Sequence, residues 1–126
     1  MVRNVFAILI APSIWFALAV PGNQLVSLAY PEALDGQTPF GLLVLLLVAS
    51  LVYTFLAGTI CAWIAKPDFR RIGLLAGLAL MALGVLTQIV YWEALPLWYH
   101  LAAIPFIVPV AMAGAHLVTR RRNTAK

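Results

Sequence analysis

The sequence predicts an all-α integral membrane protein, an antiparallel up-down bundle of four transmembrane helices with both termini in the cytoplasm. Composition is the first observation: 64% of the 126 residues are hydrophobic and 10% are charged, whereas soluble domains carry about 25% charged residues. Charge placement is the second. All Lys and Arg residues lie at Arg3, in the run 66–71 or in the tail 120–126, and three of the four acids lie in the breaks between them. Because cytoplasmic flanks of spanning helices collect Lys and Arg, the basic side is predicted to be cytoplasmic.

Four apolar runs are each long enough to cross a bilayer, at about 5–30, 40–65, 72–91 and 97–118. A helix needs about 20 apolar residues to cross a hydrocarbon core about 30 Å thick. The runs lack the alternating polar residues of a membrane barrel, so each is expected to satisfy its backbone hydrogen bonds as a helix. Because the connections are short, consecutive helices are expected to be antiparallel, and residues 1–126 to form a single four-helix domain.

The first run also has features of a cleavable signal peptide. Arg3 precedes an apolar segment that contains the small-residue sequence Ala17-Leu18-Ala19. We expect the run to be retained as the first span, because apolar character resumes after Pro21 and makes the stretch too long for a typical signal core.

Small residues predict the faces on which two of the helices pack, since lipid tails give helices no hydrophobic reason to associate. At about 100° of rotation per residue, the second run gathers small residues within an arc of about 100°: Ser50, Thr54, Ala57, Gly58, Cys61 and Ala65. The third run gathers Gly73, Gly77, Gly84 and Gln88 within about 60°. This glycine face could pair two copies of the chain, but contact with the other helices of the same bundle is the favoured interpretation.

Prolines interrupt the first and last runs, at Pro12 and Pro21 and at Pro105 and Pro109. Each removes one helical donor and frees an upstream carbonyl, so kinks are expected. The freed carbonyls could line a wet cavity. We favour the alternative that neighbouring groups satisfy them, as in many spanning helices.

A short internal repeat accompanies this pattern. Residues 30–34 (YPEAL) and 91–95 (YWEAL) match at four of five positions, 61 residues apart. The offset is typical of two helical hairpins related by duplication. Chance matches of Ala and Leu are the competing explanation in so apolar a chain.

Polar and aromatic side chains are densest near the outer ends of the first, third and fourth runs, and these form the candidate ligand site: Asn23, Gln24, Gln88, Tyr91, Trp92, Glu93, Trp98, Tyr99 and His100. Tyr and Trp are common at the headgroup level of any membrane protein. Gln88 and His100 are more informative, because a buried amide or imidazole without a partner costs several kcal/mol in hydrocarbon. Hydrogen bonds that join the first, third and fourth helices are the favoured interpretation, and a ligand site is the alternative.

No catalytic, metal or cofactor chemistry is expected. Neither Ser nor Cys lies in sequence beside His100 as a nucleophile, and Cys61 is predicted to be a small packing residue near the opposite membrane face. His100 and His116 are about 24 Å apart along one helix, which excludes a shared metal. No charged residue lies at the centre of a run, unlike in most proton-coupled transporters.

The segment 91–101, YWEALPLWYHL, resembles a group of small uncharacterised bacterial four-span inner-membrane proteins. The resemblance implies a four-span fold in the bacterial inner membrane and carries over no activity and no functional residues. We therefore expect a non-enzymatic accessory, assembly or structural subunit, with a binder or transporter of a lipid- or quinone-like molecule as the alternative. Expected partners are membrane lipids and either further copies of the chain or a larger membrane complex. Nucleic acid is not expected, because the cations flank helix ends, where anionic headgroups are nearer.

Overall fold

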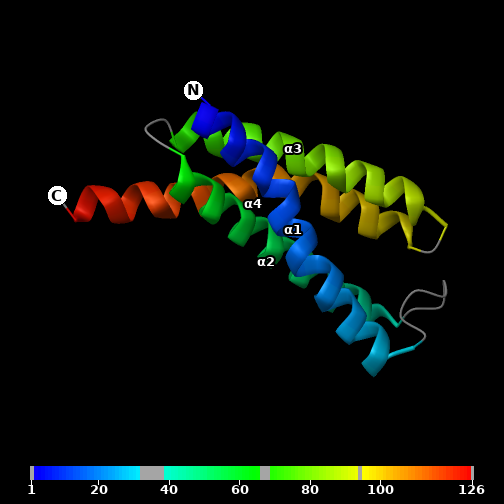
Figure 1. Cartoon of the computed structure of the whole chain (residues 1–126). Helices are drawn as coiled ribbons and strands as arrows, with labels where there is room; N and C mark the ends of the chain where they lie inside the picture. The colour runs from blue at the N-terminus through cyan, green and yellow to red at the C-terminus, as the bar shows by residue number, and fades with distance from the viewer. Residues whose placement is uncertain (1, 32–38, 66–68, 94, 126) are drawn as a thin grey trace.

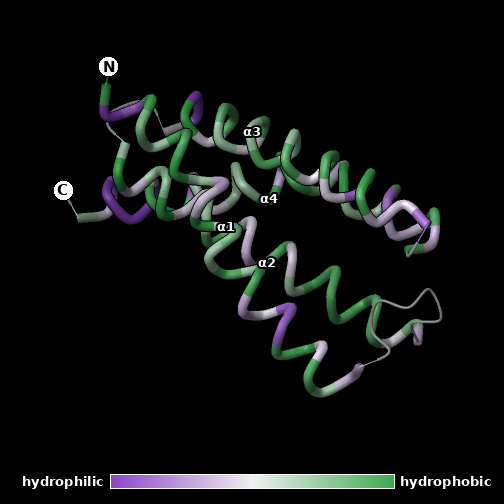
Figure 2. The backbone as a smooth tube through the Cα atoms, turned by 45° about the vertical axis from the view of Figure 1, so that its right-hand side comes forward, coloured by the Kyte–Doolittle hydropathy of each residue, from purple (hydrophilic) through white to green (hydrophobic). Residues whose placement is uncertain are grey.

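The computed structural model describes residues 2–31, 39–65, 69–93 and 95–125. Four helices account for almost all of them: α1 (Val2–Ala29), α2 (Phe40–Ile64), α3 (Phe69–Val90) and α4 (Leu97–Thr124). All four are long enough and apolar enough to cross a membrane, which confirms the predicted all-helical class with four helices of spanning length. Figure 2 shows hydrophobic residues along most of each helix, with hydrophilic residues gathered toward the ends.

The helix bounds differ from the predicted spans mainly in α4, which continues to Thr124 although the apolar run ends at about residue 118. An apolar run marks the hydrocarbon, whereas Arg is a good helix former and lets the backbone continue beyond it. The Thr124 hydroxyl donates to the main-chain oxygens of Arg120 and Arg121, which holds the last turn closed. Both α1 and α4 remain helical through their internal prolines. Most of the YPEAL copy of the repeat lies outside the described residues.

Both chain termini lie at one end of the molecule, close to where α2 ends and α3 begins (Figure 1). We call this the terminal end, and the opposite end, with Ala29, Phe40, Val90 and Leu97, the loop end. Within the described residues α1 contacts α2 and α3, α4 contacts the same two helices, and α1 does not contact α4. Toward the loop end, the pair α1–α2 diverges from the pair α3–α4, as Figures 1 and 2 both show.

The closest helix contact joins α2 and α4 through small residues. A Cβ added at Gly58 would collide with the backbone of Ala111, and one added at Gly114 with the carbonyl oxygen of Phe55. The predicted small-residue face of α2 is buried at Thr54, Ala57, Gly58, Cys61 and Ala65, which confirms it as a packing face. Ser50, the member nearest the loop end, is only half-buried.

The glycine face of α3 also packs against α4 of the same chain. A Cβ added at Gly73 would lie 2.7 Å from Cβ of Ala115, and one added at Gly77 would lie 3.2 Å from Cα of Val108. Neither approach leaves room for a larger side chain without movement of α4. The interpretation that these glycines serve contacts within the bundle is confirmed.

The core is divided along the helices. Its main cluster draws buried residues from all four helices, and its fully buried α1 members, Ala7 and Ala11, lie in the half of α1 nearer the terminal end. At the loop end the core cluster joins α2 to α4, through Leu43, Tyr99 and Ala103. No cluster of described residues joins α1 to α3 there. The space between the pairs α1–α2 and α3–α4 is therefore closed by packed side chains between α2 and α4. Between α1 and α3, no cluster of buried hydrophobic described residues closes it.

Candidate ligand cavity at the loop end

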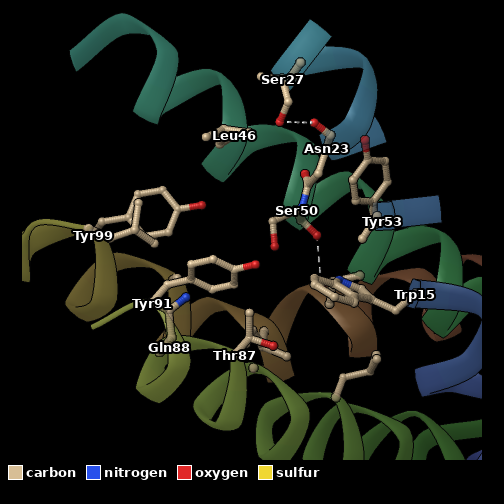
Figure 3. A pocket seen from close by; sticks show the side chains of 18 residues that line it. Trp15, Asn23, Ser27, Leu46, Ser50, Tyr53, Thr87, Gln88, Tyr91 and Tyr99 are labelled. Atoms are coloured by element: carbon tan, nitrogen blue, oxygen red, sulfur yellow. Dashed lines mark hydrogen bonds between the residues drawn. The ribbon is translucent and has the colours of Figure 1, made fainter. Parts of the chain in front are cut away.

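A cavity of about 140 Å³ occupies this space. All four helices and the α3–α4 connection contribute to its walls, which Figure 3 shows from close by. The polar part of the lining comes from hydroxyl and amide side chains: Asn23, Ser27, Ser50, Tyr53, Thr54, Thr87, Gln88, Tyr91 and Tyr99. Apolar lining includes Trp15, Leu46, Leu80 and Ile107. None of the lining residues that the structure describes carries a charged side chain.

All but one of the hydroxyl groups of the described lining, that of Ser50, fall into two kinds. Ser27, Thr54 and Thr87 donate to main-chain oxygens four residues earlier in their own helices, at 2.9 to 3.0 Å. Helical Ser and Thr commonly satisfy themselves in this way. The phenol groups of Tyr53, Tyr91 and Tyr99 make no hydrogen bond to any other described residue. In Figure 3 the Tyr91 and Tyr99 hydroxyls project into the cavity, so a molecule inside it would meet unused donors and acceptors.

Gln88 and His100 form a hydrogen-bonded pair that joins α3 to α4. His100 is 2% exposed, its Nδ1 contacts Oε1 of Gln88, and its Nε2 lies 3.3 Å from the main-chain oxygen of Trp92. The indole of Trp92 stacks on the imidazole, with ring centroids 4.5 Å apart. Tyr99 meets the same ring edge-on, at 6.5 Å. These contacts immobilise the imidazole behind the cavity wall, while Gln88 itself reaches the lining.

The predicted site residues are therefore distributed in three ways. Asn23, Gln88, Tyr91 and Tyr99 line the cavity, and Trp92 and His100 support Gln88 from behind. Trp98 packs against Phe40, with ring centroids 5.2 Å apart, and takes no part in the lining. Gln24 and Glu93 are exposed and also lie off the cavity.

Sequence reasoning missed the contribution of α2 and the middle of α1. Ser50, Tyr53 and Thr54 form one wall, and Trp15 lies at the base of the cavity. Ser50 and Thr54 are one helical turn apart, so their hydroxyls share a face with the packing residues that follow. The hydroxyl groups of Ser50 and Thr54 could have indicated this wall from the sequence. Small residues alone are sufficient for close helix packing, so hydroxyl groups at the start of the small-residue face suggest an additional role.

No family model matches the chain, and no curated protein or solved structure matches it. Among the described residues, no group of three or more His, Cys, Asp and Glu side chains could hold a metal ion. Cys61, fully buried, donates its thiol hydrogen to the main-chain oxygen of Ala7 at 3.0 Å and lies outside the lining. The arrangement offers hydrogen bonds and apolar contact without a charged partner.

Proposed function

We propose that this chain is a non-enzymatic multi-pass inner-membrane protein that binds a neutral amphiphile of the outer leaflet in the cavity at the loop end. The observation that carries the proposal is a cavity between helices that are long and apolar enough to cross a bilayer. Its described lining is uncharged and includes phenol groups that bond to no other described residue. An unpartnered polar group costs free energy in an apolar medium, and the cost is removed when a ligand or water bonds to it.

The topology is part of the proposal. We infer an antiparallel up-down bundle with both termini in the cytoplasm of a bacterial cell. The described cations Arg3, Arg70, Arg71 and Arg120 to Arg122 all belong to the helix segments nearest the terminal end. Cytoplasmic flanks favour Lys and Arg. This orientation puts the loop end, and with it the cavity, in the outer leaflet.

The size of the cavity limits what part of a ligand it can enclose. A cavity of about 150 Å³ in a soluble protein binds one benzene molecule, and the cavity here measures about 140 Å³. One six-membered ring or a headgroup of similar size therefore fits. A phosphate headgroup is disfavoured, because no Lys or Arg of the described part of the chain lines the walls to offset its charge. A quinone-like or other small neutral headgroup with an apolar tail meets both limits.

Access from the membrane follows from the division of the core. Leu43 and Tyr99 close the α2–α4 side at the loop end. On the other side, Asn23 and Ser27 of α1 and Tyr91 beyond α3 are exposed although they line the cavity. We infer that the ligand reaches the site laterally, between α1 and α3, and that its tail stays in the lipid.

An accessory or assembly subunit remains the competing proposal for this chain. For such a subunit, we would expect the polar side chains inside the bundle to form hydrogen bonds with one another between helices. The Gln88–His100 pair has that character, but the three phenols do not. The cavity therefore favours ligand binding over a purely structural role.

Native mass spectrometry of gently purified protein tests the proposal. We expect a small neutral molecule retained at about one per chain and lost in Ser50→Phe, which places a ring inside the cavity. Ser13→Phe is the matched control, since Ser13 is exposed on α1 and does not line the cavity. If the wild-type protein carries only bulk lipid in bulk proportions, in monomers or in a complex with other subunits, the binding function is wrong.

A further inference from the structure

The hydrogen bonds of His100 restrict how Gln88 can be oriented. Nδ1 of the imidazole meets Oε1 of Gln88, and Nε2 meets the main-chain oxygen of Trp92 at 3.3 Å. A neutral imidazole has one N–H group and one acceptor nitrogen, so it cannot donate to both oxygens. Three arrangements remain. The ring is an imidazolium; or a neutral ring donates from Nδ1 to Oε1, which leaves a bare Nε2 facing the lone pairs of the Trp92 oxygen; or the Gln88 amide is rotated by a half turn so that its NH₂ group donates to Nδ1.

The described surroundings of His100 contain no counter-charge for an imidazolium. Its side chain is 2% exposed and makes no ion pair with a described carboxylate. The groups that face it from α3, α4 and the turn between them are Gln88, Tyr99 and Trp92, and none of these is anionic. A charged group without a partner at this depth costs several kcal/mol. The main-chain oxygen of Trp92 can only accept, so it takes the single N–H, and Nδ1 must accept from Gln88.

We propose that His100 holds Gln88 with its carbonyl oxygen toward the cavity, and that this oxygen selects ligands that carry a hydroxyl group. The inference rests on the proposed ligand-binding function and adds the chemical class of the ligand: a neutral amphiphilic alcohol or phenol with a head of about one ring. The amide of Gln88 lies beside Tyr91 in Figure 3. Tyr91 and Tyr99 can donate or accept, so they admit either kind of ligand. Gln88 cannot rotate without losing its bond to His100, so it supplies the discrimination.

A matched pair of probes tests this selection. The phenol 3-bromo-5-octylphenol offers a hydroxyl donor, and its methyl ether has the same ring, tail and bromine without that donor. Bromine quenches indole fluorescence at short range, and Trp15 lines the cavity. Quenching that disappears in Trp15→Phe reports binding in the cavity, because Trp63, Trp92 and Trp98 remain in that variant.

We expect the wild-type protein to bind the phenol about tenfold more tightly than the ether, since a buried carbonyl left without a donor loses about one hydrogen bond. Gln88→Met should reduce the ratio to about one. His100→Phe frees the amide to rotate and should also reduce the ratio. The ratio of phenol to ether affinity in the wild-type protein can overturn the inference by itself. The test therefore remains decisive even if His100→Phe fails to fold.

The outcomes separate the two proposals. Equal affinities in the wild-type protein, or tighter binding of the ether, overturn the selection by Gln88 and leave the cavity as a binding site. A phenol preference that persists in Gln88→Met also overturns it. Absence of Trp15-dependent quenching by either probe contradicts the proposed binding function itself.

Discussion

The indole of Trp92 lies parallel to the imidazole of His100, with ring centroids 4.5 Å apart and an angle of 10° between the planes. Trp92 also accepts a hydrogen bond from that ring through its main-chain oxygen, at 3.3 Å. The turn between α3 and α4 thus covers one face of His100 and satisfies one of its nitrogens. The other nitrogen is satisfied by Gln88 on α3, so α3, the turn and α4 are joined at one residue.

Removing either member of the Gln88–His100 pair should destabilise the bundle. We expect Gln88→Leu and His100→Phe each to lower the free energy of unfolding by about 1–3 kcal/mol, because the first leaves the buried His100 without its partner and the second leaves the half-buried Gln88 without its partner. The double variant should cost less than the sum of the two, since neither of the paired side chains remains to lose the other. Unfolding by SDS in mixed micelles measures all three. Strictly additive effects would show that the two side chains act independently.

The contact between α2 and α4 should be intolerant of larger side chains at Gly58. A Cβ there would meet the backbone of Ala111, which cannot move without shifting α4. We expect Gly58→Leu to reduce stability by about 1–3 kcal/mol or to prevent folding. Gly41→Leu is the matched control, because a Cβ at Gly41 meets nothing within 4 Å. Equal stability of the two variants in the same micelles would contradict the observed helix contact.

The helical class and the packing faces could be predicted from the sequence because both depend on local patterns. Run length and polarity identify spanning helices, and residue size at a helical period identifies close approach. Gly73 and Gly77 met α4 and Thr54, Cys61 and Ala65 were buried, as those patterns indicated. The helix α4 continues to Thr124, beyond the predicted end of the last span, because hydropathy marks the edge of hydrocarbon and not the end of a helix.

The cavity could be predicted only in part, because it depends on where two helix pairs diverge. The sequence predicted that the polar side chains of Asn23, Gln88 and Tyr99 lie at a similar depth near the outer ends of their helices, and all three line the cavity. Ser50 and Tyr53 enter the lining because α1 separates from α3 toward the loop end, which no local pattern records. His100 was expected to need a partner, but the choice of Gln88 and Trp92 over Asn23 follows from the tertiary geometry.

The proposed orientation can be tested with cysteines introduced on opposite sides, because the native thiol should not interfere. Cys61 is fully buried and bonded to the main chain of α1, so we expect a membrane-impermeant maleimide to label it only after unfolding in SDS. In a Cys61→Ala background, Leu34→Cys should be labelled from the periplasm and Asp68→Cys only after the membrane is opened. Labelling of both positions from the same side would refute the proposed topology.

Arg122 should contribute to the stability of α2 as well as to the basic charge of the terminal end. Its guanidinium donates to the main-chain oxygen of Trp63 at 3.0 Å, in the last turn of α2, where carbonyl groups lack helical partners. We expect Arg122→Ala to lower the free energy of unfolding by about 0.5 kcal/mol, the scale of a single exposed charge-assisted contact. Arg121→Ala removes the same charge from the neighbouring, exposed position and serves as the control. If both variants lose the same stability, the general charge and not the contact with Trp63 accounts for the effect, and salt should then reduce both losses equally.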